Sequence, residues 1–96
     1  MAVAYIMLFD DAREEKYDAV TADLGLDGTE AQWPDGIISH TAGKTADGWC
    51  VIDVWESAAQ FEAFRDARLG PAMAKVGDIG EPKMTTFEVH NRYPAA

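Results

Sequence analysis

The order of strand-like and helix-like segments constrains the fold of this chain more than any other feature. Residues 2–9 are apolar at both odd and even positions and rich in β-branched and aromatic side chains, which predicts a central strand. Residues 37–42, 49–56 and 84–93 also have strand patterns, and the polar stretch 43–48 predicts a hairpin turn. Four strands are therefore expected.

Two stretches with helical periodicity separate these strands. In the first, apolar residues recur at helical spacing among charged ones: Tyr17, Val20 and Leu24. This helix is expected to begin at a capping box of Asp11 and Glu14 and to end at Gly25. A second capping box, Ser57 with Gln60, predicts a second helix. We expect Gly70 and Pro71 to interrupt it.

The resulting order, βαββαβ, predicts a ferredoxin-like α+β fold with a four-stranded antiparallel sheet and two helices on one face. At this length, residues 1–96 are expected to form a single domain. The other face of the sheet then has no helix over it. An apolar open face is usually hidden by a second copy packed sheet to sheet, so we expect a homodimer.

Composition excludes several classes of partner. The net charge of −9 repels phosphate backbones and anionic lipids, so we expect no nucleic acid and no membrane partner. The longest apolar run, residues 2–9, is much shorter than the ~20 residues of a membrane helix, and no basic segment followed by a cleavage site stands before it. A cytoplasmic protein is expected. The single cysteine, Cys50, cannot form an internal disulfide, and neither a metal nor another cofactor is expected.

The two faces of the strand at 49–56 differ in kind. The even-numbered positions carry compact side chains: Cys50, Ile52 and Val54. The odd-numbered positions, which point to the opposite face, combine aromatic residues with a carboxylate: Trp49, Val51, Asp53 and Trp55. Because an ionised carboxylate without a partner is costly under a helix, we assign the Asp53 parity to the open face. On the last strand, Phe87 and Val89 suit the core. The opposite parity is then assigned to the open face, with Thr86, Glu88, His90 and Arg92.

The hairpin register decides where His40 lies. A turn of four residues places His40 opposite Asp53 and Ile38 opposite Trp55, whereas a turn one residue longer or shorter sends His40 to the helix side. A carboxylate beside an imidazole fixes its tautomer and raises its basicity, which suits proton abstraction from an activated carbon. The alternative is a partly exposed strand histidine near a solvated acid.

The remaining candidates would bind a ligand or assist the base. His90, with Glu88 on the same strand, is a second catalytic candidate. Tyr5 could donate a hydrogen bond to a substrate oxygen, although a tyrosine in a central strand more often only packs. Trp49 and Trp55 could stack on a flat aromatic ligand beside Ile38, and Trp55 could equally be a packing anchor.

The chain resembles the dimeric α+β barrel superfamily, which includes the antibiotic-biosynthesis monooxygenase-like proteins. The resemblance rests on the element order and on the residues Val-Trp-Glu-Ser at 54–57, followed by Phe61 and Phe64. Gly48-Trp49 and the Val-His-Asn at 89–91 are similar to small actinobacterial members. The superfamily includes cofactor-free oxygenases and cyclases as well as haem degraders and proteins with no known reaction.

The resemblance implies a pocket more than it implies a reaction. Haem-degrading members carry a helix tryptophan and an axial histidine at positions that fall on Phe64 and Ala74 here, which argues against haem degradation. We expect a cofactor-independent monooxygenase- or cyclase-like protein that abstracts a proton from an aromatic or polyketide-like molecule. The alternative is a non-catalytic dimeric protein that binds a hydrophobic small molecule or acts in a stress response.

Overall fold

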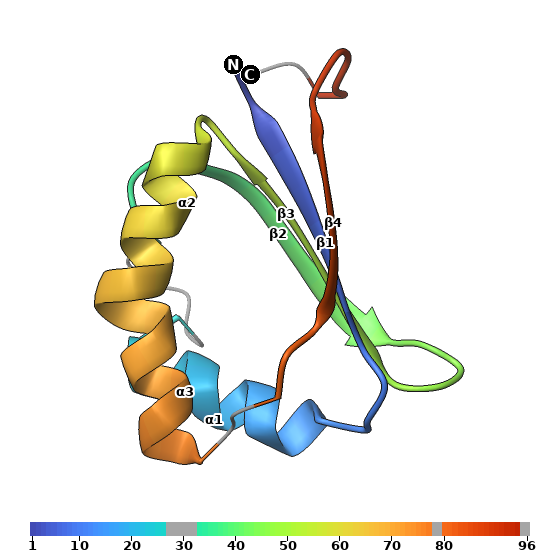
Figure 1. The fold of residues 1–96 in the computed structure, drawn as a ribbon, viewed down its shortest axis with the longest axis vertical. Helices are drawn as coiled ribbons and strands as arrows, with labels where there is room; N and C mark the ends of the chain where they lie inside the picture. The colour runs from blue at the N-terminus through green and yellow to red at the C-terminus, as the bar shows by residue number, and fades with distance from the viewer. Residues whose placement is uncertain (27–32, 78–79, 95–96) are drawn as a thin grey trace.

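The computed structural model describes residues 1–26, 33–77 and 80–94. A four-stranded antiparallel sheet carries helices on one of its faces (Figure 1). The elements in chain order are β1 (Val3–Phe9), α1 (Glu14–Leu24), β2 (Ile37–Lys44), β3 (Trp49–Trp55), α2 (Ala58–Phe64), η1 (Arg65–Leu69), α3 (Gly70–Val76) and β4 (Lys83–Glu88). The strand order in the sheet, β2-β3-β1-β4, confirms the predicted ferredoxin-like α+β fold.

The end of α1 follows the prediction and its beginning does not. Gly25 adopts the left-handed conformation with φ 74°, and its N–H donates to the carbonyl of Ala22, which satisfies a free group at the helix terminus. At the other end, Arg13 is the N-cap and no side chain caps the helix. The expected capping box is therefore wrong. The Asp11 carboxylate instead accepts two hydrogen bonds from the buried guanidinium of Arg13, at 2.8 and 3.0 Å.

The second helix begins as predicted, because the side-chain oxygen of Ser57 accepts a hydrogen bond from the N–H of Gln60 at 3.3 Å. It does not stop at Gly70 and Pro71. In Figure 1, α2 and α3 form one continuous column. The five-residue segment η1 is a π-helical turn, in which the N–H of Gly70 donates to the carbonyl of Arg65. Since Pro71 has no N–H, this wider turn carries the helix past it.

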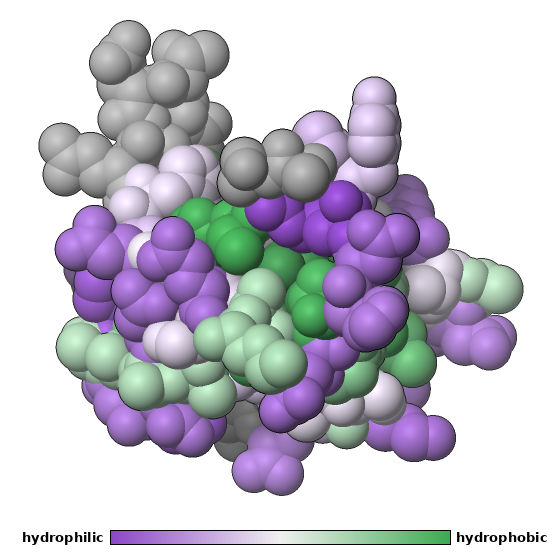
Figure 2. Space-filling model, turned by 90° about the horizontal axis from the view of Figure 1, so that it is seen from above, coloured by the Kyte–Doolittle hydropathy of each residue, from purple (hydrophilic) through white to green (hydrophobic). Residues whose placement is uncertain are grey.

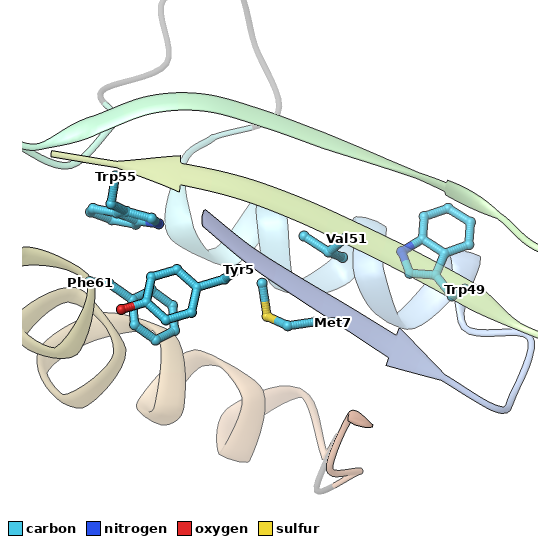
Figure 3. Close-up of a cluster of buried hydrophobic side chains, with 6 residues drawn as sticks. All are labelled: Tyr5, Met7, Trp49, Val51, Trp55 and Phe61. Carbon is cyan, nitrogen blue, oxygen red and sulfur yellow. The ribbon is translucent and has the colours of Figure 1, made fainter. Parts of the chain in front are cut away.

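The core lies between the sheet and α2. Six side chains form it, as Figure 3 shows: Tyr5, Met7, Trp49, Val51, Trp55 and Phe61. Five of them belong to one parity of β1 and β3, so this parity faces the helices. The assignment of Trp49, Asp53 and Trp55 to the open face is therefore wrong. Asp53 lies under the helices because it has hydrogen-bonding partners there, and the cost of an unpaired carboxylate does not arise.

The open face carries the opposite parity and includes exposed apolar side chains. Leu8, Ile52 and Phe87 are 43%, 43% and 50% exposed. The assignment of the β4 faces is corrected in the same way, because Phe87 pairs with Ala4 and so lies on the open face. Thr86 pairs with Tyr5, on the helix side. All residues of β4 are exposed, as expected for an edge strand that the helices leave uncovered.

Candidate functional site

The register between β2 and β3 brings His40 and Asp53 together. The two residues are Cα partners, which confirms the predicted pairing. A bulge between Ile37 and Ser39 changes the pairing farther along, so that Ile37 lies opposite Trp55. The predicted pairing of Ile38 with Trp55 is therefore wrong by one residue, because Ile38 occupies the bulge.

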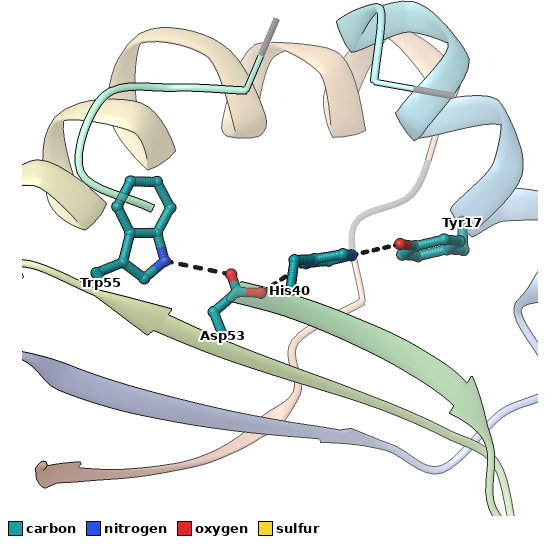
Figure 4. A network of polar contacts seen from close by, with 4 residues as sticks. All are labelled: Tyr17, His40, Asp53 and Trp55. Atoms are coloured by element: carbon teal, nitrogen blue, oxygen red, sulfur yellow. Dashed lines mark hydrogen bonds and ion pairs between the residues drawn. The ribbon is translucent and has the colours of Figure 1, made fainter. Parts of the chain in front are cut away.

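Hydrogen bonds hold the Asp53 carboxylate in a buried position (Figure 4). The Nδ1 atom of His40 lies 2.6 Å from Oδ1, and the indole N–H of Trp55 donates to Oδ2 over 3.3 Å. Asp53 is 6% exposed and Trp55 is fully buried. Because a carboxylate only accepts hydrogen bonds, the His40 nitrogen that faces it carries the proton. Asp53 therefore selects the tautomer of His40 and leaves Nε2 as an acceptor.

That acceptor nitrogen has a partner on α1. The Tyr17 hydroxyl lies 2.5 Å from Nε2 of His40, so a phenol, an imidazole and a carboxylate form one continuous chain (Figure 4). Burial, the negative charge of Asp53 and that of Asp18 raise the pKa of Tyr17 above its ordinary value of 10.0. At neutral pH, Tyr17 therefore keeps its proton and donates it to His40.

Tyr17 was predicted only as an apolar position of a helix. The spacing of Tyr17, Val20 and Leu24 indicates a buried helix face and carries no information on the hydroxyl group. Tyr17 could have been identified from the side of the sheet on which His40 lies. With His40 on the helix side, the one tyrosine on the apolar stripe of α1 is the natural partner for it.

These groups line a pocket of about 270 Å³ between the sheet and the helices. Its walls are largely apolar and come from both layers, with Met7, Val51, Val20, Phe64 and Met73 among the lining residues. Figure 2 views the molecule from one end of the sheet and shows apolar side chains gathered between hydrophilic rims. An apolar pocket with a few convergent polar groups is the usual form of a small-molecule site. The predicted position of the pocket, on the open face, is corrected to the helix side.

Two of the predicted ligand-binding aromatic residues have clear positions. Trp49 is buried and lines the pocket, and its ring centroid lies 5.2 Å from that of Tyr17. Trp55 packs edge-on against Phe61 and does not line the pocket among the residues described. Its connection to the site is the hydrogen bond to Asp53.

The other predicted residues lie away from the pocket in the described structure. Tyr5 stacks on Phe61, with ring centroids 4.1 Å apart, and burial raises its pKa. Ile38 borders a separate surface hollow beside His40. Glu88 and His90 are exposed. The structure thus brings together His40, Asp53 and Trp49, and it does not bring Glu88 or His90 to them.

Two negative findings apply to the described part of the chain. Within residues 1–26, 33–77 and 80–94, no three histidine, cysteine, aspartate or glutamate side chains gather as a potential metal site. No helix in these ranges is long and apolar enough to cross a membrane.

The fold matches those of several solved structures. A protein of Mycobacterium tuberculosis, Rv0793, has a TM-score of 0.65 and 21% identity, over 97% of this chain and 99% of its own. A candidate antibiotic biosynthesis monooxygenase from Chloroflexus aurantiacus has a TM-score of 0.64 and 17% identity, over 96% of this chain and 97% of its own.

A third match is a variant of SnoaB, a cofactor-independent oxygenase from Streptomyces nogalater. It has a TM-score of 0.59 and 16% identity, over 98% of this chain and 96% of its own. No protein-family model and no curated protein sequence matches the chain. At these identities the likeness is one of fold, and it extends over nearly the whole chain. The structures that share the fold thus include antibiotic biosynthesis monooxygenase-like proteins, as the sequence resemblance predicted.

Proposed function

We propose that this chain is a cofactor-independent monooxygenase- or cyclase-like protein that acts on an aromatic or polyketide-like molecule. One observation carries the proposal: the His40 imidazole is held between a buried carboxylate and a phenol at the wall of an apolar pocket. A fold shared with a cofactor-independent oxygenase supports the same class of reaction. Proton abstraction from an activated carbon or a phenol requires a base of this kind.

In the proposed first step, His40 is the base and Asp53 positions it. The carboxylate holds Nδ1–H, keeps Nε2 as the acceptor and stabilises the imidazolium that forms. Its second oxygen is bonded to Trp55, which limits rotation of the carboxylate. The base is thus oriented before a substrate arrives.

Tyr17 connects this base to the substrate. Because its raised pKa keeps the phenol neutral, we infer that Tyr17 transfers its proton to Nε2 of His40 as its oxygen takes a proton from the substrate. The Tyr17 oxygen gains the proton of the substrate as it gives its own proton to His40, so no free tyrosinate accumulates. The substrate is left as a carbanion or phenolate.

Two products can follow from this anion. A carbanion at a methylene group can combine with dioxygen to give a peroxide anion. This anion takes a proton back from the His40 imidazolium through Tyr17, and the resulting hydroperoxide loses water to give a ketone. One oxygen atom is then in the product and the other in water. Alternatively, the carbanion can attack a carbonyl group of the same molecule and close a ring. Both reactions use the same base and require no cofactor.

Binding without chemistry is the second candidate function. In the structure, Nε2 of His40 is occupied by the Tyr17 hydroxyl, so the nitrogen that would act as a base is already hydrogen-bonded. A ligand-binding protein would use the same pocket with this network as a fixed wall. The two functions differ in whether a bound substrate is consumed.

A second copy of the chain forms part of the proposal. The open face exposes Leu8, Ile52 and Phe87, and apolar patches of this kind mark contact surfaces. The face carries the same residues in every copy, so two copies can pack sheet to sheet around a two-fold axis. The pocket lies on the opposite side of each sheet, so each copy would retain its own site.

Oxygen uptake with 1,8-dihydroxy-9-anthrone tests the catalytic proposal. The wild-type protein should increase the rate of oxygen consumption and quinone formation above the spontaneous rate. His40→Gln should reduce the protein-dependent rate by about 100-fold or more, because general base catalysis contributes at least that much. Tyr17→Phe should also reduce it strongly, since the relay passes through the phenol.

The matched control is His90→Gln, which makes the same chemical change at an exposed histidine outside the pocket. It should retain the wild-type rate. Full activity of a folded His40→Gln protein would exclude the proposed base. Saturable binding of the anthrone with no rate above background would favour the binding function instead.

A further inference from the structure

One buried polar group of the pocket has no partner in the described structure. Trp49 is 6% exposed and lines the pocket, and its indole nitrogen is buried without a hydrogen-bonding partner among the described residues. An indole N–H can only donate a hydrogen bond. Since nearly all buried polar groups in proteins are paired, an unpaired donor at a pocket wall indicates that something else supplies the acceptor.

Trp55 gives the contrast within the same strand. It lies on the same face of β3, and its N–H donates to Asp53 over 3.3 Å. The Trp55 donor is therefore paired within the protein. The two tryptophans therefore differ, because the N–H of Trp55 completes an internal network and that of Trp49 has no partner among the described residues.

The position of Trp49 relates this donor to the proposed base. Its ring packs against that of Tyr17, whose hydroxyl is bonded to His40. In Figure 3, the indole nitrogen lies on the edge of the ring that faces Val51, another residue of the pocket lining. The unpaired donor thus points along the pocket wall, beside the relay.

We propose that the indole N–H of Trp49 binds an acceptor oxygen of the ligand, which makes the ligand an apolar ring system that carries a carbonyl or phenolate oxygen. The proposal rests on the proposed function and names its substrate class more closely. If the oxygen is conjugated to the position that loses a proton, negative charge develops on it during that step. A fixed donor in an apolar site stabilises such charge.

The ketone 1-tetralone and the hydrocarbon tetralin form a suitable pair of probes. They share one carbon skeleton and differ in the acceptor oxygen. NMR spectra of the ¹⁵N-labelled protein contain separate indole N–H signals for its three tryptophans. On addition of 1-tetralone, the Trp49 proton should move downfield as the hydrogen bond forms, and tetralin should not produce this shift.

The affinities provide a second measurement. Calorimetric titration should show that 1-tetralone binds more tightly than tetralin, and Trp49→Phe should reduce this ratio about fivefold, as loss of one neutral hydrogen bond implies. The matched control is Trp33→Phe, since Trp33 also lines the pocket. This variant should keep the wild-type ratio even if both affinities change.

The proposal is overturned if 1-tetralone binds while the Trp49 signal stays unchanged, or if a folded Trp49→Phe protein keeps the wild-type ratio. Failure of both probes to bind saturably also overturns it. If Trp49→Phe does not fold, the shift in the wild-type spectrum still decides. These measurements report binding, whereas the anthrone assay reports turnover with His40 variants, so failure of one proposal is distinguishable from failure of the other.

Discussion

The Tyr17 hydroxyl and the His40 imidazole join α1 to the edge strand β2, with 2.5 Å between the phenol oxygen and Nε2. This hydrogen bond connects the helical layer to the sheet. Since Asp53 accepts from the other ring nitrogen, the imidazole is bonded at both ends and cannot rotate without breaking a bond. Its orientation thus depends on the packing of α1 against the sheet.

The tautomer of His40 is therefore predictable. The chain has two histidines, so ¹⁵N NMR spectra of the imidazole rings can resolve each of them. Near pH 8, His40 should show a protonated Nδ1 and an unprotonated Nε2. The exposed His90 should show a mixture of both tautomers and serves as the internal reference. A His40 ring protonated at Nε2 would contradict the Asp53–His40–Tyr17 chain.

Stability at high pH should depend on Tyr17. Its pKa is raised in the folded protein, so the folded state holds this proton more tightly than the unfolded state does. The resulting stability is fully present below the ordinary pKa of 10.0 and is lost as the pH rises through the folded pKa. Urea unfolding between about pH 8 and pH 11 should show a less steep decline for Tyr17→Phe than for the wild type.

Tyr93→Phe is the control for this measurement, because Tyr93 is 95% exposed. It should reproduce the wild-type dependence on pH. An identical decline in the wild type and in Tyr17→Phe would show that burial does not alter the ionisation of Tyr17.

Gly48 should be essential for the contact between the hairpin and β1. A Cβ atom at this position would lie 2.0 Å from the backbone oxygen of Phe9, which is too short for any side chain. Gly48→Ala should therefore lower the free energy of unfolding by about 2 kcal/mol or more. Gly43→Ala is the control, because nothing lies within 4 Å of its Cβ position. Equal unfolding midpoints for the two variants would disprove this steric explanation.

The open face gives a prediction about assembly. Sedimentation equilibrium at micromolar concentration should give about twice the chain mass of 10.5 kDa. Ile52→Lys, which places a charge at an exposed apolar position of that face, should shift the protein to monomer. Ala63→Lys, at an exposed position of α2, should leave the dimer intact. A wild-type monomer at this concentration would refute the proposed dimer.

The sequence was sufficient for the topology and for one decisive pair. Strand and helix patterns alternate clearly, and counting back from the hairpin turn placed His40 opposite Asp53. The faces could not be assigned from the same pattern. The Asp53 carboxylate has two partners under the helices: His40 lies opposite it on β2, and the Trp55 indole is two residues away on the same face. Hydrogen bonds between side chains are not visible in a hydrophobic pattern.

Local irregularities limited the rest. The bulge at Ile38 and the π-helical turn each fit one extra residue into a strand or helix. The residue types at these positions do not distinguish them from a regular strand or helix. Tyr17 was missed because its helical spacing indicates only that its ring packs, and a partner for its hydroxyl follows only once His40 is placed on the helix side. Because the faces of the sheet were assigned the wrong way round, the pocket was predicted on the open face and not on the helix side.

The π-helical turn η1 changes the direction in which the side chains of α3 point relative to those of α2. Phe61 and Met73 are twelve residues apart, which in a regular α-helix would set them about 120° apart around the axis. The wider turn takes up about one residue, so the effective difference falls to roughly 20°. Both side chains can then line one pocket, as observed. Deleting a single residue within 65–69 would restore a regular helix and keep this alignment, whereas inserting one would rotate α3 away from the pocket.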